Sequence, residues 1–218
     1  MYYLVDKIKQ EVRTVLDRNS VSTSLAGLDD IDTLSIDDMI EYAIEDAARI
    51  VECNAPSHLL DKGCLLATQI GWDKEKGKGS GYVPLPDDFM RLISFQMSDW
   101  DYPVTEAITE EDYRYALQRS PITGLRGNPQ RPVVAITKWP IGLVLEFFSC
   151  NAGANVSVKR ARYIPIPKIK DNDSGAKQID LCEKLKSSIV YYTAYLVSQI
   201  IEPSAANHLL ETSKALMN

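Results

Sequence analysis

The 218-residue chain has only two histidines, His58 and His208, and neither is part of a recognised metal-ligand motif. A catalytic histidine needs a neighbour that orients it, and a metal site needs several ligands, so the sequence favours structural or surface roles for both. No serine lies in a G-x-S-x-G turn, which argues against nucleophilic hydrolysis. We therefore expect no catalytic residues and no enzyme activity.

Closely spaced cysteines and long apolar runs are also missing. The four cysteines are Cys53, Cys64, Cys150 and Cys182, and no pair has the short gap of a zinc or redox motif. No apolar stretch approaches the roughly 20 residues that cross a bilayer, and the N-terminus does not resemble a secretory signal. These absences predict reduced thiols in a soluble protein that is made in the cytoplasm and not exported.

The sequence has no phosphate-binding loop. The nearest match is Gly71 with Gly77 and Lys78, but the gap is one residue too long, and Gly79 stands where a Ser or Thr would bind magnesium. The residues that follow favour a strand, so a helix N-terminus would not be available for phosphate. We predict a basic hairpin loop here and no cofactor or metal.

Charge is unevenly distributed along the chain. The total is 24 basic and 30 acidic residues, a net charge of −6, which argues against a protein that coats DNA with its whole surface. Residues 29–46 contain eight acids and no base, whereas residues 113–170 contain ten bases and one acid, Glu146. The sequence predicts a chain with one acidic and one basic region.

Four segments have the apolar spacing of amphipathic helices. We predict helices over residues 3–18, from an N-cap at Ser35 to Asn54, over 178–201, and over 204–217 after Pro203. The apolar face predicted for the third helix consists of Ile179, Cys182, Leu185, Ile189, Leu196 and Ile200.

The middle of the chain is rich in strand-forming residues and turn signals. The predicted elements are a long-looped hairpin over 64–86, a strand over 87–100, a short helix over 110–118, and strands near 133–139, 143–150 and 156–164. The expected fold class is α+β, a helical bundle built from both termini with an inserted antiparallel β domain. Its expected parts are N-terminal helices (1–61), the β domain (62–170) and C-terminal helices (171–218).

Two charged surfaces are candidate binding sites. Asp38, Glu41 and Glu45 recur at about one-turn steps on the second helix, where they form a solvated face or, less often, a divalent-cation site. Arg160 and Arg162, beside Lys159, lie on one predicted strand, where they form either the solvent face of the β domain or a contact with phosphates or an acidic protein. Few aromatic residues lie between these bases, which disfavours recognition of single strands or of specific sequences.

Two short segments resemble a known family. The segment Pro86-Asp87-Asp88-Phe89-Met90-Arg91-Leu92 resembles the "P-x-D-F-x-R-L" pattern of head-to-tail adaptor proteins of short-tailed bacteriophages, also called head-completion, gatekeeper or tail tubular proteins. Arg162 to Pro167 is similar to the "Y-x-x-x-P" strand ending that precedes the long C-terminal helix of the family. The motif residues are Pro86, Asp88, Phe89, Arg91 and Leu92.

The resemblance implies a structural protein of the virion, located in the neck or tail. Such proteins form a ring, commonly of about twelve subunits, that binds the portal, extends the DNA channel and supports the next tail protein. Genomic DNA would pass through the ring without sequence recognition, and no membrane partner is expected. The alternatives are another ring or minor tail component of a virion and, less favoured, a metal-dependent nuclease.

Within such a ring, candidate contacts follow from the two charged surfaces. Asp38, Glu41 and Glu45 of one subunit would face Arg160 and Arg162 of another, or the acidic helix would line the channel. Four apolar residues of the last helix are the candidate portal contact: Leu209, Leu210, Leu216 and Met217.

Overall fold

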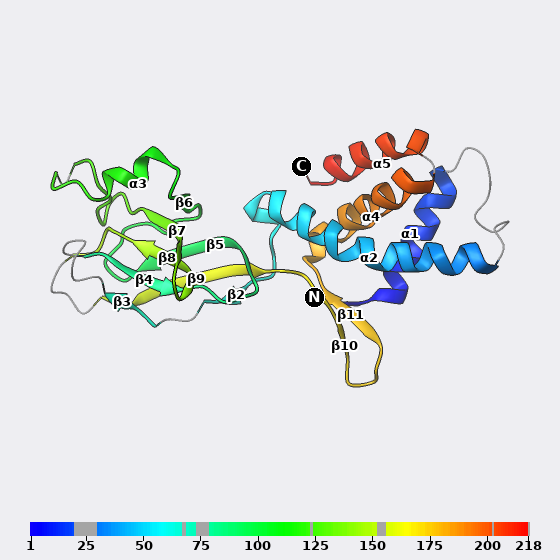
Figure 1. Ribbon diagram of the computed structural model, residues 1–218, viewed down its shortest axis with the longest axis horizontal. Helices are drawn as coiled ribbons and strands as arrows, with labels where there is room; N and C mark the ends of the chain where they lie inside the picture. Colours follow the sequence, from blue (N-terminus) through cyan, green and yellow to red (C-terminus); the bar gives the residue numbers. More distant parts are fainter. Residues whose placement is uncertain are drawn as a thin grey trace. The chain divides into compact units, whose positions relative to one another are not determined.

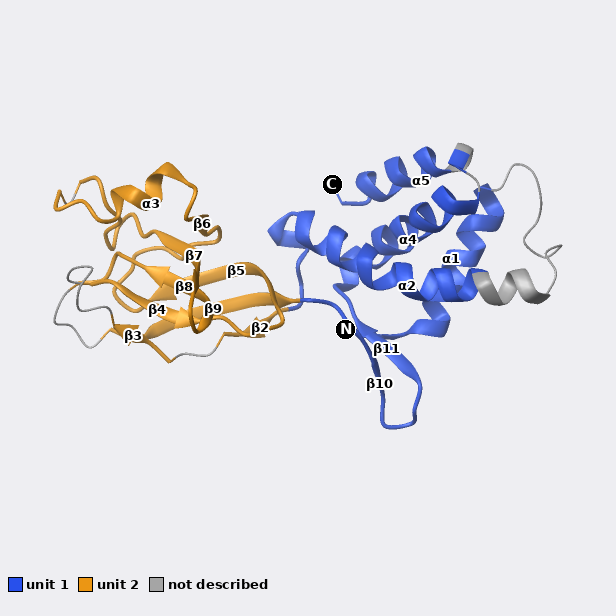
Figure 2. Ribbon diagram, viewed as in Figure 1, with its two compact units in different colours: residues 1–62, 166–218 blue, residues 63–165 orange. Residues whose placement is uncertain are grey.

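The computed structural model describes residues 1–19, 30–66, 69–72, 79–122, 124–151, 156–201 and 203–217, with only the backbone described at residues 30–35, 204 and 205. The chain divides into two compact units (Figures 1 and 2). Unit 1 contains residues 1–62 and 166–218, and unit 2 contains residues 63–165. Helices and sheets are both present, so the α+β class is confirmed.

Helices make up most of unit 1: α1 (Val5–Asn19), α2 (Asp30–Asn54), α4 (Lys186–Ile201) and α5 (Pro203–Ala215). The apolar stripes predicted for the first two helices are confirmed, because Ile8 and Val12 of α1 and Ile40 and Ile44 of α2 are fully buried. The predicted start of the second helix is wrong. α2 begins at Asp30, so Ser35 lies inside the helix instead of capping it. Among the described helices, none is long and apolar enough to span a bilayer.

A small antiparallel sheet completes unit 1. Its strands, in the order β1-β11-β10, are β1 (Tyr2–Leu4), β11 (Lys177–Asp180) and β10 (Ile169–Asp171). The helix predicted over 178–201 is therefore wrong in its first part, where β11 and a 3₁₀ turn, η3 (Glu183–Leu185), precede α4. Ile179 and Leu185 are buried as predicted, but β11 pairs on both sides, and these backbone hydrogen bonds override the helical spacing.

The buried face of α4 also differs from the predicted one. Leu196 is half-buried and Ile200 is 67% exposed, whereas small side chains such as Ala194 face the interior. Ser188 of α4 and Ser213 of α5 are fully buried, and each hydroxyl donates to the carbonyl of the other residue, at 3.0 and 2.9 Å. Small residues on this face let the two helices approach closely.

Unit 2 contains two sheets and a short helix. The first sheet has the order β2-β9-β5, and the second has the order β3-β4-β8-β7-β6. The elements of unit 2 are β2 (Cys64–Leu65), β3 (Gly71–Trp72), β4 (Gly81–Pro84), β5 (Phe89–Met97), β6 (Ile108–Thr109), α3 (Tyr113–Leu117), β7 (Val134–Trp139), β8 (Gly142–Phe147) and β9 (Val158–Pro165). A 3₁₀ turn, η2 (Ser57–Leu59), precedes them and belongs to unit 1.

The predicted strands over 87–100, 133–139, 143–150 and 156–164 and the short helix are confirmed. One pair of strands departs from the antiparallel prediction, because the two-residue strand β6 runs parallel to β7. Of the predicted hairpin, β3 and β4 pair as expected, but residues 73–78 of its loop lie outside the described residues. Residues 152–155, between the predicted strands near 143–150 and 156–164, also lie outside the described residues.

Both sheets of unit 2 contribute to one hydrophobic core. Phe95 and Met97 of β5 pack in the same cluster as Val83 of β4 and Phe147 of β8, and all four are fully buried. The rings of Phe95 and Phe147 lie 6.2 Å apart. Residues 166–170, predicted as part of the β domain, lie instead in unit 1, where they lead into and form β10.

Candidate functional site

The segment that resembles the adaptor motif forms a turn and the start of a core strand. The Phe89 amide donates to the Pro86 carbonyl at 3.0 Å, which closes the turn before β5. Leu92 is buried in the core of unit 2, and Arg91 is half-buried opposite Ile164 of β9. The motif residues therefore set where β5 begins and how it pairs with β9.

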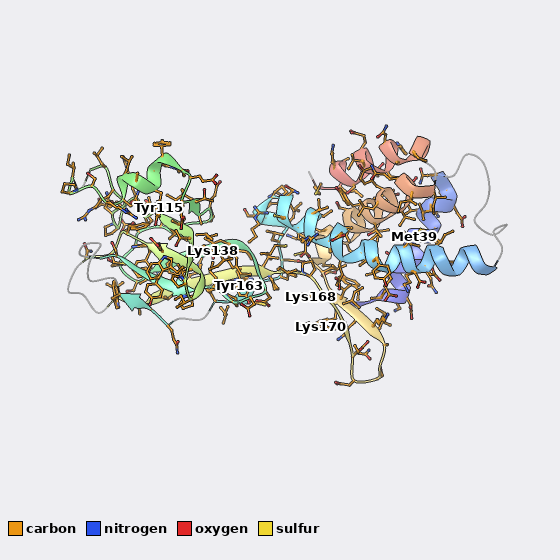
Figure 3. All side chains as sticks on the ribbon, in the orientation of Figure 1. Met39, Tyr115, Lys138, Tyr163, Lys168 and Lys170 are labelled. Atoms are coloured by element: carbon orange, nitrogen blue, oxygen red, sulfur yellow. The ribbon has the colours of Figure 1, made fainter. Side chains whose placement is uncertain are left out.

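The two segments that carry the resemblance are in contact. The hydroxyl of Tyr163, on β9, donates to Oδ1 of Asp88 at 2.9 Å, and its ring stacks on Phe89 with centroids 5.7 Å apart and planes at 24°. Burial, followed by the hydrogen bond to Asp88, raises the pKa of Tyr163 to about 12. Figure 3 labels Tyr163 in unit 2. We call Asp88, Phe89 and Tyr163 the motif cluster.

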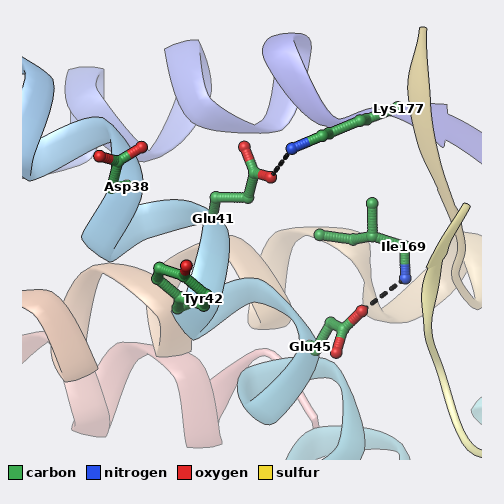
Figure 4. Close-up of a pocket in the computed structure, with 6 residues that line it drawn as sticks. All are labelled: Asp38, Glu41, Tyr42, Glu45, Ile169 and Lys177. Carbon is green, nitrogen blue, oxygen red and sulfur yellow. Dashed lines mark hydrogen bonds and ion pairs between the residues drawn. The ribbon is translucent and has the colours of Figure 1, made fainter. Parts of the chain in front are cut away.

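The acidic face of α2 is largely paired inside unit 1. Glu41 forms ion pairs with Lys9 of α1 and Lys177 of β11, and Glu45 Oε1 accepts from the Ile169 amide of β10 at 2.6 Å (Figure 4). The hydrogen bond from Lys177, and then that from Lys9, lowers the pKa of Glu41. These carboxylates hold the helices of unit 1 against its sheet.

This pairing corrects the prediction that Asp38, Glu41 and Glu45 form a solvated face available to another subunit. Of the three, only Asp38 is exposed, and it forms no ion pair within the described part of the chain. It lies beside a hollow of about 380 Å³ that Tyr42, which is 82% exposed, also lines. A sequence cannot show this pairing, because Lys177 lies 136 positions from Glu41.

The bases of the predicted basic strand are exposed. Lys159, Arg160 and Arg162 of β9 are exposed, and none of them forms an ion pair with a residue that the structure describes. Next to them Leu65 of β2 is 82% exposed. A hollow of about 510 Å³ runs along these residues, and we call it the basic groove. Its lining is Leu65, Leu66, Val158, Lys159, Arg160, Ala161 and Arg162.

The four residues predicted to contact the portal have different environments. Leu209 is fully buried, so it belongs to the core of unit 1 and is not available to a partner in this structure. Leu210 and Met217 are half-buried, and Leu216 is 42% exposed. The part of this surface that a partner could reach is therefore the end of α5.

Two buried carboxylates have roles that were not predicted from the sequence. Glu146 of β8, the single acid of the basic region, accepts from Trp139 Nε1 at 2.7 Å, from Thr137 at 2.9 Å and from Tyr115 at 3.2 Å. The signal in the sequence is an acid within an apolar run, because a valine and a leucine precede Glu146 and two phenylalanines follow it. These hydrogen bonds join α3 to the sheet.

The second buried carboxylate is Glu52 of α2, which is fully buried and lies 2.9 Å from the ammonium of Lys62. Glu52 also accepts from the Cys182 amide at 2.9 Å, and Lys62 donates to the Asp180 carbonyl at 2.6 Å. This ion pair joins the end of α2 to the segment between β11 and α4, so it has a structural role in unit 1.

No cluster of three or more His, Cys, Asp or Glu side chains that could hold a metal occurs among the residues described. Cys53 and Cys64 are exposed thiols, whereas Cys150 and Cys182 are buried, and burial raises the pKa of each buried thiol to about 12.

Comparisons with known proteins do not assign the chain to a family. No model of a known protein family matches its sequence, and no curated protein matches it either.

Proposed function

We propose that this chain is a structural protein of a phage virion, a head-to-tail connector whose copies form a ring under the portal. The ring would extend the DNA channel and support tail attachment. The motif cluster is the observation that carries the proposal. Asp88 and Phe89 come from one segment that resembles the adaptor family and Tyr163 from the other, and a chance likeness in two distant segments gives no reason for contact between them.

In this proposal each subunit is a helical bundle, built from both ends of the chain, that carries an inserted and mainly antiparallel β domain. The division into units supports it, because the four long helices all lie in unit 1 and the first unit 2 residue follows directly after Lys62. A connector needs no catalytic turnover and no cofactor. Its partners would be further copies of this chain, the portal, a tail protein and DNA passing through without sequence recognition.

The portal contact would lie at the end of α5, at Leu210, Leu216 and Met217. Deleting α5 is a poor test, because Ala206, Leu209 and Ser213 are buried and their removal would uncover α4. A better test is the double variant Leu216→Asp with Met217→Asp. Ile141→Asp is the matched control, since Ile141 is an exposed apolar residue of unit 2.

The decisive experiment mixes the protein with the portal protein encoded in the same genome and images the mixture by negative-stain electron microscopy. We expect a ring attached to one end of the portal, with the double variant defective in attachment and the control unaffected. A mixture in which the wild-type protein neither forms a ring nor co-sediments with the portal overturns the proposal. Binding to a tail protein without binding to the portal would instead assign the chain to another ring of the virion.

A further inference from the structure

Unit 2 has a second exposed charged surface besides the basic groove. Residues 101–111 contain four acids and no base, and we call them the acidic segment. All four carboxylates are exposed, as is 66% of Tyr102. The four acids are Asp101, Glu106, Glu110 and Glu111.

The bases that follow in the sequence do not neutralise the acidic segment. Arg114 is held by Asp112, with guanidinium-to-carboxylate distances of 2.6–3.1 Å, and Arg119 lies over the ring of Tyr115. Arg126 and Arg131 form no ion pair with the acidic segment among the residues whose placement is described. Glu110 Oε1 accepts from the Lys138 amide at 3.2 Å, but all four carboxylates are exposed and none forms an ion pair with a residue that the structure describes, so their charge is available to a basic partner.

The basic groove and the acidic segment lie at opposite edges of one sheet. Phe95 of β5 has Ala161 of β9 on one side and exchanges two hydrogen bonds of 2.8 Å with Val104 on the other. Beyond β9 lies β2, which carries Leu65 of the groove. In Figure 1, β2 and the β6–α3 region accordingly lie on opposite sides of unit 2.

This separation decides which contacts are possible. From β9, which carries Arg160 and Arg162, across β5 to Val104 is two strand spacings, roughly 10 Å, and no ion pair joins the two surfaces among the residues described. The two charged surfaces of one unit 2 therefore do not neutralise each other in this structure. Complementary surfaces that stay unpaired within one body can pair between copies, and such a head-to-tail contact can repeat around a ring.

We propose that the basic groove binds the acidic segment of a second copy of this chain. The inference rests on the proposed function and names the surfaces that join subunits of the ring. Carboxylates of the segment would pair with Arg160 and Arg162, and the ring of Tyr102 would cover Leu65. Arg and Tyr are enriched at the centres of protein interfaces, and Leu65 would add apolar area that the contact buries.

The groove suits a protein better than DNA. Interfaces with DNA are polar and strongly positive along several phosphates, whereas the groove places three bases around an exposed leucine and alanine, leucine and valine side chains. Contact with phosphates would leave Leu65 in water, and contact with Tyr102 would bury it.

The test uses charge reversal and a zero-length crosslinker. A carbodiimide joins lysine amines to carboxylates. In a mixture of ¹⁴N- and ¹⁵N-labelled protein, a crosslink between a light and a heavy peptide is intermolecular, and we expect such crosslinks from Lys159 to the acidic segment. The double variant Arg160→Glu with Arg162→Glu keeps Lys159, whose amine forms the crosslink. In this variant we expect the crosslink yield to fall at least about tenfold. Glu106→Lys with Glu111→Lys should cause a similar loss.

Rescue distinguishes a direct contact from a folding defect. A 1:1 mixture of the two double variants, or one chain that carries all four changes, restores opposite charge at each contact and should restore the crosslinks. The matched control is Lys168→Glu with Lys170→Glu, two exposed lysines of unit 1 that Figure 3 labels, and it should leave the yield unchanged.

The outcomes separate this inference from the proposed function. Wild-type rings on the portal without these crosslinks, or reversed variants that still form rings, would overturn the inference and leave the connector role intact. Crosslinks with rescue but no ring on the portal would support the inference and overturn the connector role. If the arginine variant lost binding to duplex DNA while its crosslinks persisted, the groove would be a DNA site and the inference would be wrong.

Discussion

Tyr163 and Asp88, 75 positions apart in the sequence, are joined by a hydrogen bond of 2.9 Å from the tyrosine hydroxyl to the carboxylate. Asp88 precedes β5 and Tyr163 lies on β9, so the bond fixes how the two strands begin to pair. We predict that Tyr163→Phe, which keeps the stack on Phe89, lowers the free energy of unfolding of unit 2 by about 1 kcal/mol. Urea unfolding followed by tryptophan fluorescence measures this, because all three tryptophans lie in unit 2.

Tyr102→Phe is the control for this prediction. Its hydroxyl is on an exposed side chain, and we expect a change within about 0.5 kcal/mol. Equal stability of Tyr163→Phe and the wild type would show that the hydrogen bond does not stabilise unit 2.

Glu41 should make unit 1 sensitive to acid. Its pKa is lowered in the folded state by Lys177 and Lys9, so its stabilisation is complete above the unfolded pKa of about 4.3 and is lost as pH falls through the folded pKa. We predict that Glu41→Gln destabilises unit 1 by about 1–2 kcal/mol at pH 7 and that the difference disappears well below pH 4. Circular dichroism at 222 nm measures this, because the long helices lie in unit 1.

Asp38→Asn is the matched control, since Asp38 lies on the same helix but is exposed and forms no ion pair with the residues described. A Glu41→Gln protein that differs from the wild type by the same amount at pH 7 and pH 3 would contradict the prediction.

The buried pair of Glu52 and Lys62 should be costly to break. Lys62→Met leaves the carboxylate of Glu52 buried without its counter-charge, and we predict a loss of about 3–5 kcal/mol in the stability of unit 1. Thermal unfolding by circular dichroism, with Lys168→Met as control, tests this. A loss no larger than that of the control would mean that the pair contributes nothing net.

Leu209 and Leu216, both predicted from the sequence as portal contacts, should differ in their effect on stability. Leu209→Ala removes a fully buried side chain and should cost about 2–5 kcal/mol, whereas Leu216→Ala at an exposed position should change stability by less than about 0.5 kcal/mol. Chemical unfolding of unit 1 distinguishes them. Similar losses for both would show that the end of α5 is packed more tightly than its exposure indicates.

Elements with strong local signals were predictable from the sequence. The apolar stripes of α1 and α2 coincide with their buried faces, and the strand-forming composition between turn signals predicted β5, β7, β8 and β9. β11 was not predictable, because Ile179 and Cys182 have helical spacing while the partners that make the segment a strand, β1 and β10, lie elsewhere in the chain. Residues 108–109 were missed for the same reason, since β6 is a strand only through its pairing with β7.

The candidate site shows the same limit. The sequence predicted the basic character of β9 from Lys159, Arg160 and Arg162, and these side chains are exposed. The pairing of Glu41 and Glu45 within unit 1 could not be predicted, because Lys177 and the amide of Ile169 come close to them only in the folded chain. Charge is visible in a sequence, whereas the pairing of charge depends on tertiary structure.

The division of the chain into units has a consequence for the order of events on the ribosome. α1 and α2 pack against α4, which is made only after residues 63–165. All of unit 2 has therefore been synthesised before unit 1 has the segments that complete its core, and domains generally fold as units during synthesis. During this interval α1 and α2 lack their packing partner α4, so the nascent chain exposes apolar surface of the kind that chaperones bind.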